Sequence, residues 1–228
     1  MSSEVQVLNA AAHLQLKLQA DPLFSHAAHD QMLPVVLAEF GQLACEYPLV
    51  FVKNADTGQL KAVALTSLQA GLNLFHQPTG WRASQIPQTL LQYPFTLLPD
   101  HAGQPVLAAL LNSPLLSDSQ GSPLFNPDGS ASVLQQQLHG QLKRFLLSLQ
   151  QTQAFIQRLS ELALFEAQTL QLADGREIAG LYLISQAKLS TLPPEVLRQL
   201  QLSGELRLVY AHLLSLQHIE KLLRWSND

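Results

Sequence analysis

The chain contains 228 residues, of which 47% are hydrophobic and 13% are charged, and its formal net charge is −4. This length suits one domain, which we expect to span residues 1–228. The negative charge and the scattered positions of the 13 Lys and Arg residues argue against a nucleic-acid partner, because phosphate contacts need clustered basic side chains.

Residues 1–111 are predicted to be rich in β-structure. The alternation of apolar and polar residues favours short strands over residues 5–7 and 14–18. A helix over residues 10–18 is also compatible with the Ala, Leu, Gln and Lys found there. Residues 21–30, which include one proline and two histidines, are predicted to form a loop.

The next elements are a helix and a hairpin. Pro34 suits the first turn of a helix over residues 35–45, and Pro48 would end that helix. Residues 49–53 and 60–65 are apolar and flank a stretch of turn-forming residues, which predicts a β-hairpin.

Short elements continue up to residue 111. A helix that Pro87 opens is predicted over residues 86–92. Strands are predicted over residues 72–75, 95–98 and 106–111.

A loop over residues 112–131, rich in Ser, Pro, Gly and Asp, separates this β-rich part from a helical part over residues 132–228. Ser132 and Gln135 have the spacing of a capping box. Apolar residues at spacings of three and four then predict a long amphipathic helix that ends near residue 164.

The remaining C-terminal elements are a hairpin and two helices. Strands over residues 168–172 and 178–184 flank the turn signal Asp174–Gly175. Helices are predicted over residues 195–202 and 206–223. Because strands and helices mix without regular βαβ alternation, we predict an α+β fold with mainly antiparallel sheet in the N-terminal half, on which the long helix and the C-terminal helices pack.

The predicted compartment is the cytoplasm. Cys45 is the only cysteine, so no internal disulfide can form, and a buried, inert thiol is expected. The first residues lack a basic segment followed by an apolar one, so no signal peptide is evident. No apolar run approaches the ~20 residues of a membrane helix, which argues against direct membrane insertion.

Cofactor motifs are weak in this sequence. His26 and His29 have Asp30 beside them, but they lie in a predicted loop without a supporting Cys pair, so we predict no metal site. Neither glycine-rich phosphate-binding motif is present, and no cofactor is predicted.

Tyr210, His212 and Ser215 form a polar group within the apolar last helix, where His212 and Ser215 share a face. A serine inside a helix cannot present its hydroxyl as the nucleophile of a hydrolase does, and the GxSxG motif is absent, so we predict no catalytic residue. Two interpretations of His212 remain open: a buried histidine that bonds the backbone, or a polar group that lines a pocket.

Aromatic residues are candidates for a binding site, because they dominate ligand pockets and interface hot spots as well as cores. We predict that Trp81, Tyr93 and His212 surround one concavity with Tyr182 nearby. Glu39 lies in an apolar stretch, where burial would raise its pKa unless it has a partner. A structural role for Glu39 as a cap or ion pair is the alternative.

Seven short sequence motifs are spread over nearly the whole chain. They are AEF (38–40), EYPLVFVKN (46–54), GLNLF (71–75), YPF (93–95), PLFNPDG (123–129), GLY (180–182) and YAHLLSL (210–216). In these strings and their order the chain resembles the SapC family of bacterial proteins. One departure is Leu91–Gln92, where members of that family often carry two arginines, and this departure weakens the idea of an anionic ligand.

The resemblance implies a context rather than a reaction. The SapC name comes from a surface-layer locus and is associated with the export of surface proteins, and the resemblance transfers no catalytic residue. We therefore expect a non-catalytic accessory or binding protein with a protein or peptide partner. An enzyme, or an enzyme subunit, that acts on a small metabolite or peptide is the alternative. The weakly charged surface is also compatible with a homo-oligomer.

Overall fold

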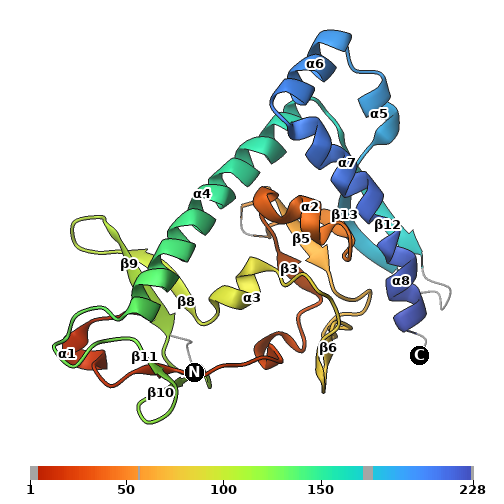
Figure 1. Ribbon diagram of the computed structural model, residues 1–228. Coiled ribbons are helices and arrows are strands. Elements are labelled where there is room, and N and C mark those ends of the chain that lie inside the picture. Colours follow the sequence, from red (N-terminus) through yellow and green to blue (C-terminus); the bar gives the residue numbers. More distant parts are fainter. Residues whose placement is uncertain (1–4, 56, 172–176, 227–228) are drawn as a thin grey trace.

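The computed structural model describes residues 5–55, 57–171 and 177–226. Within these ranges helices and strands mix without regular βαβ alternation, and the paired strands run antiparallel. The predicted α+β class is confirmed. A long helix, α4 (Val133–Glu161), crosses the molecule and joins two groups of strands (Figure 1).

Helix α4 starts where the sequence predicts, because Ser132 caps it. The Ser132 Oγ accepts a hydrogen bond from the Gln135 N–H at 3.2 Å. The apolar face of α4 enters two separate hydrophobic clusters. Its N-terminal half contributes Leu138 and Leu142 to the smaller cluster, and its C-terminal half contributes Phe155, Ile156 and Leu159 to the larger one. Helix α4 therefore connects two cores.

The larger cluster contains a five-stranded sheet with the order β12-β13-β4-β5-β3. Its strands are β3 (Met32–Pro34), β4 (Leu49–Lys53), β5 (Leu60–Leu65), β12 (Phe165–Gln171) and β13 (Glu177–Ile184). The predicted hairpin is confirmed as β4 and β5. Strand β13 follows α4 in the chain and pairs with β4 through Tyr182 and Phe51, so both halves of the sequence build this sheet. The predicted turn at Asp174–Gly175 lies outside the described residues.

The smaller cluster packs between α4 and a three-stranded sheet with the order β1-β9-β8. Its strands are β1 (Val5–Val7), β8 (Phe95–Pro99) and β9 (Pro105–Leu110), as the sequence predicts. Shorter strands form two further small sheets. They are β2 (Lys17–Leu18) with β10 (Leu116–Ser117) and β11 (Ser122–Pro123), and β6 (His76–Gln77) with β7 (Gly80–Trp81).

The segment over residues 10–18 divides between the two predicted structures. It forms the helix α1 (Ala10–His13), which Asn9 caps by accepting from the Ala12 N–H at 3.0 Å, and then the short strand β2. The strand predicted over residues 14–18 is therefore too long, because the turn that follows α1 takes up its first residues.

The helix predicted over residues 35–45 is also wrong in extent. Pro34 ends the edge strand β3, which pairs with β5, and the helical part divides into a 3₁₀ turn, η2 (Leu37–Glu39), and the short helix α2 (Phe40–Leu43). Because α2 ends at Leu43, Cys45 is exposed rather than buried, and the expected burial of its thiol is wrong.

Two other predictions need correction. Residues 72–75 form no strand; instead the buried Asn73 accepts a hydrogen bond from the Phe75 N–H at 3.0 Å. The last predicted helix is two helices, α7 (Glu205–Ser215) and α8 (His218–Trp225). Ser215 is the last residue of α7, and its hydroxyl donates to the His212 carbonyl oxygen and accepts from the Leu49 N–H of β4.

The remaining helices are short. They are η1 (Ser25–Ala27), α3 (Gln88–Gln92), α5 (Gln186–Ser190) and α6 (Pro194–Leu202), of which α3 and α6 agree with prediction and α5 was not predicted. Within the described ranges, no helix combines the length and the apolar character needed to cross a membrane.

Candidate functional site

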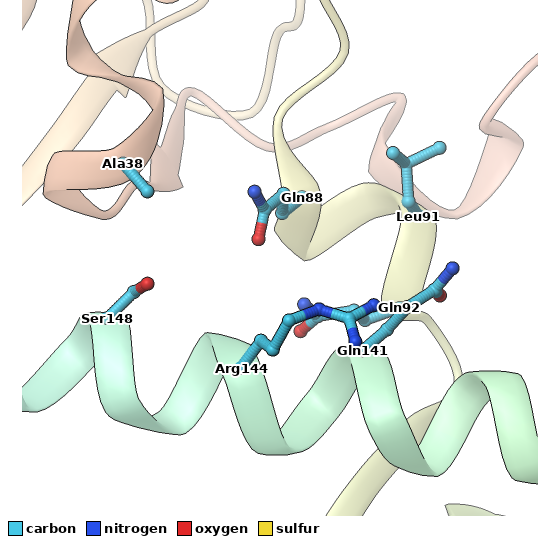
Figure 2. A pocket seen from close by; sticks show the side chains of 7 residues that line it. All are labelled: Ala38, Gln88, Leu91, Gln92, Gln141, Arg144 and Ser148. Atoms are coloured by element: carbon cyan, nitrogen blue, oxygen red, sulfur yellow. The ribbon is translucent and has the colours of Figure 1, made fainter.

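A hollow of about 580 Å³ lies between α4, α3 and η2 (Figure 2). We call it the α3–α4 hollow. Seven side chains line it: Ala38, Gln88, Leu91, Gln92, Gln141, Arg144 and Ser148. Its volume lies within the range of roughly 300–1,000 Å³ that is typical of ligand sites.

Glu39 holds two walls of the hollow together. Its buried carboxylate accepts hydrogen bonds from the Val36 N–H at 3.2 Å and from the Gln88 N–H at 2.6 Å, and so connects the start of η2 to the start of α3. Burial raises the pKa of Glu39, and these two backbone donors act in the opposite direction. Glu39 therefore has the structural role that was one of its two predicted roles, while its side chain lies outside the lining.

Thr152 attaches η2 to the third wall. Its Oγ1 accepts from the Leu37 N–H at 2.9 Å, and its hydroxyl donates to the Ser148 carbonyl oxygen at 2.6 Å. The Leu37 N–H lies at the start of a helical turn, where backbone donors lack an intrahelical partner. The three walls are thus fixed to one another by side chains behind the lining.

The polar groups of the lining are free to bind another molecule. Among the described residues, the side-chain amides of Gln88, Gln92 and Gln141 have no hydrogen-bond partner, and the Arg144 guanidinium has no ion-pair partner. Gln92 is only 8% exposed as a residue, and its amide reaches solvent through the hollow that it faces.

The lining is suited to binding rather than to proton transfer. An amide both donates and accepts hydrogen bonds, and a guanidinium donates several bonds in a planar fork. The seven lining side chains include no carboxylate, imidazole or thiol. General acid–base catalysis would need such a group within reach of the reacting atoms.

Two smaller hollows adjoin the C-terminal end of α3. An apolar one of about 350 Å³ lies between α4 and β8 and shares Gln92 with the α3–α4 hollow. Another of about 150 Å³ shares Leu91 with the α3–α4 hollow and Tyr93 with the apolar one. Tyr93, which stacks on His26 with ring centroids 4.0 Å apart, lines both of these smaller hollows.

His212 and Ser215 lie in the core. The His212 Nε2 accepts from the Ile184 N–H at 3.0 Å, and the Ser215 Oγ accepts from the Leu49 N–H at 3.0 Å. Both side chains are fully buried and hold α7 to strands β13 and β4. Burial lowers the pKa of His212 from 6.5 to about 4, because it disfavours the charged form.

The other predicted site residues do not form one group, although Trp81 packs against Phe24, whose ring neighbours the His26 ring on which Tyr93 stacks. Trp81 donates its Nε1–H to the Tyr47 hydroxyl at 2.7 Å, inside an aromatic cluster. Tyr182 lies on the sheet with the Lys53 ammonium 5.1 Å from its ring, and Tyr210 is exposed on α7.

The structure does not bring Trp81, Tyr93 and His212 around one concavity. The prediction that His212 lines such a concavity is wrong, because its side chain is fully buried and cannot line an open surface. The sequence shows that His212 lies on an apolar helix, but it does not show that this face packs against the sheet.

Sequence reasoning missed the lining of the α3–α4 hollow. Its polar members on α4 are Gln141, Arg144 and Ser148, whose spacing of three and four places them on one helical face. That face was visible in the sequence, but polar residues on one side of an amphipathic helix usually face solvent. In the described residues, no group of three or more His, Cys, Asp or Glu side chains could hold a metal ion.

The comparison with protein families gives one match, in which the SapC family model covers residues 8–222. The chain belongs to the SapC family. The match includes η2, α3 and the whole of α4, and therefore every residue of the α3–α4 hollow. Neither the comparison with curated proteins nor the comparison with solved structures found a match.

Proposed function

We propose that this SapC-family chain is a non-catalytic accessory protein that binds a peptide segment of a partner protein in the α3–α4 hollow. The observation that carries this proposal is the lining, which combines unpaired amides with one unpaired guanidinium and lacks an acid–base group. Such a lining can hold a ligand by hydrogen bonds but offers no group to transform it.

An extended peptide matches this lining in two ways. Its backbone presents N–H donors and carbonyl acceptors in turn, and the amides of Gln88, Gln92 and Gln141 can bond both kinds. The apolar hollow beyond Gln92 contains Leu146 and Leu149, which can pack against an apolar side chain of the same peptide.

Family membership supports a place for this binding in the cell. The SapC name is associated with the export of surface proteins, so we propose that the partner is such a protein, held in the cytoplasm before export. The alternative function, an enzyme that acts on a small metabolite, rested on the group formed by Tyr210, His212 and Ser215. His212 and Ser215 bond the sheet instead, so that group does not support the alternative.

The proposal is tested by display of a random peptide library on the purified chain, followed by fluorescence polarisation with the recovered peptides. Gln141→Trp places a large side chain in the hollow from an exposed helical position. Gln150→Trp is the matched control, since Gln150 is exposed on α4 and does not line the hollow. Far-UV circular dichroism confirms that both variants fold.

We expect Gln141→Trp to weaken peptide binding at least about tenfold, or 1.4 kcal/mol, while Gln150→Trp leaves it unchanged. Recovery of no peptide, or equal binding by the two variants, would contradict the proposal. Equal binding would show that the peptide contacts another surface.

A further inference from the structure

We infer that the peptide held in the α3–α4 hollow presents a carboxylate to Arg144, an inference that rests on the proposed function. Arg144 is the only charged side chain in the lining. Its guanidinium lies along α4 toward Gln92 and Gln141 rather than away from the hollow (Figure 2). The charge therefore faces the place where the ligand would lie.

The Arg144 guanidinium lies over Gly140, one turn earlier on α4. A Cβ built on Gly140 would lie 3.7 Å from the nearer guanidinium nitrogen, in van der Waals contact. A longer side chain at position 140 would compete with the guanidinium for the same space. Side chains on a helix generally lean toward its N-terminus, so Arg144 covers the turn that contains Gly140.

No residue in the described part of the chain supplies an anion to Arg144. The only carboxylate on α4 is that of Glu161, at the far end of the helix. Arg158, on the same helix, has a partner in Glu205 at 2.7 Å, whereas Arg144 forms no ion pair with a described residue. Glu39 does not line the hollow, and its two carboxylate oxygens already accept hydrogen bonds from the backbone N–H groups of Val36 and Gln88.

The surroundings of Arg144 favour a carboxylate over a more highly charged anion. One guanidinium can bind one carboxylate through two parallel hydrogen bonds. The amides of Gln92 and Gln141 are neutral and lie beside it, so the site carries one positive charge. A phosphate group carries nearly two negative charges at neutral pH and would leave part of its charge without a partner.

The carboxylate has two sources in a peptide, an acidic side chain and the chain terminus. Peptides recovered on the wild-type chain are therefore synthesised in matched forms. One pair replaces Asp or Glu by Asn or Gln, and the other pair replaces the free C-terminus by an amide. The replacement that lowers the affinity of the peptide for the wild-type chain identifies which carboxylate binds Arg144.

The decisive variant is Arg144→Gln, which keeps a polar side chain and removes the charge. Lys143→Gln is its matched control, because it removes one positive charge from the neighbouring position, which does not line the hollow. We expect Arg144→Gln to weaken binding of the carboxylate form about tenfold and to leave the amide form unchanged, since the variant removes a charge-assisted hydrogen bond that only the carboxylate can make. Lys143→Gln should change neither.

The outcomes separate the inference from the proposed function. If acid and amide forms bind equally to the wild type and to Arg144→Gln, the carboxylate is refuted while peptide binding stands. If millimolar inorganic phosphate displaces every peptide from the wild type but not from Arg144→Gln, the site selects phosphate and the inference is again refuted. If no form binds at all, the proposed function itself fails.

Discussion

The structural role of His212 predicts an unusual dependence of stability on pH. In the folded chain its Nε2 accepts the Ile184 N–H, and burial lowers its pKa to about 4 from the ordinary 6.5. The folded state therefore disfavours the protonated imidazole, whereas the unfolded chain binds that proton near pH 6.5. The stabilising effect of the neutral ring is fully present above pH 6.5 and is lost as the pH falls toward about 4.

The expected size follows from the two pKa values. A fall from 6.5 to about 4 corresponds to about 3 kcal/mol of unfolding free energy that disappears over this interval. His212→Gln keeps an acceptor for the Ile184 N–H and cannot be protonated. At pH 7.5 the wild type should be more stable than this variant by about 1–2 kcal/mol, because the imidazole fills its site beside Phe51 better.

The assay is urea denaturation of both proteins between pH 7.5 and pH 4.5, followed by circular dichroism. Other titrating groups, such as His218 and Glu39, are common to both proteins and cancel in the difference of unfolding free energy. That difference should shrink as the pH falls and should reverse in sign near pH 5. A difference that stays constant would show that His212 titrates in the folded state as in the unfolded chain, and would refute its assignment as a buried structural acceptor.

Substitutions at three other residues test the hydrogen bonds that build the fold and the hollow. Ser215→Ala leaves the buried Leu49 N–H without its acceptor, and should lower the unfolding free energy by about 1–3 kcal/mol in urea denaturation. Thr152→Val removes the acceptor of the Leu37 N–H and should cost about 1–2 kcal/mol, while Thr152→Ser, which keeps the hydroxyl, should cost less. Glu39→Gln removes one of two carboxylate acceptors and should lower the melting temperature; an unchanged melting temperature would show that Glu39 does not connect η2 to α3.

Local patterns predicted the elements that depend on local interactions. Strands β4 and β5 follow from two apolar runs around a turn, and α4 follows from its apolar period and its cap at Ser132. Pro34 shows where such patterns fail, because its missing N–H is tolerated both in the first turn of a helix and in an edge strand. Pairing of β3 with β5 decides between them, and that pairing depends on residues far away in the sequence.

The candidate site could not be predicted from local sequence patterns, because it too depends on contacts between residues far apart in the sequence. Its walls are joined by the bond between Glu39 and Gln88, which are 49 residues apart, and by the bond between Leu37 and Thr152, which are 115 residues apart. Glu39 was predicted as a candidate, but its apolar surroundings did not reveal which segments it connects. Arg144 has no neighbour in the sequence that marks it as a ligand-binding residue.

The position of α4 explains why binding groups are left unpaired beside apolar surface. Each end of the helix is buried in a different cluster, so its middle is covered by neither. Leu146 and Leu149 remain 40% and 38% exposed, next to the amide of Gln92. A small anion would satisfy Arg144 alone, whereas a peptide that bonds Gln92 and covers both leucines would also bury their apolar surface, which stabilises a complex by about 25 cal/mol per Å². A peptide therefore satisfies the whole surface around the C-terminal end of α3, and an isolated ion satisfies only one residue of it.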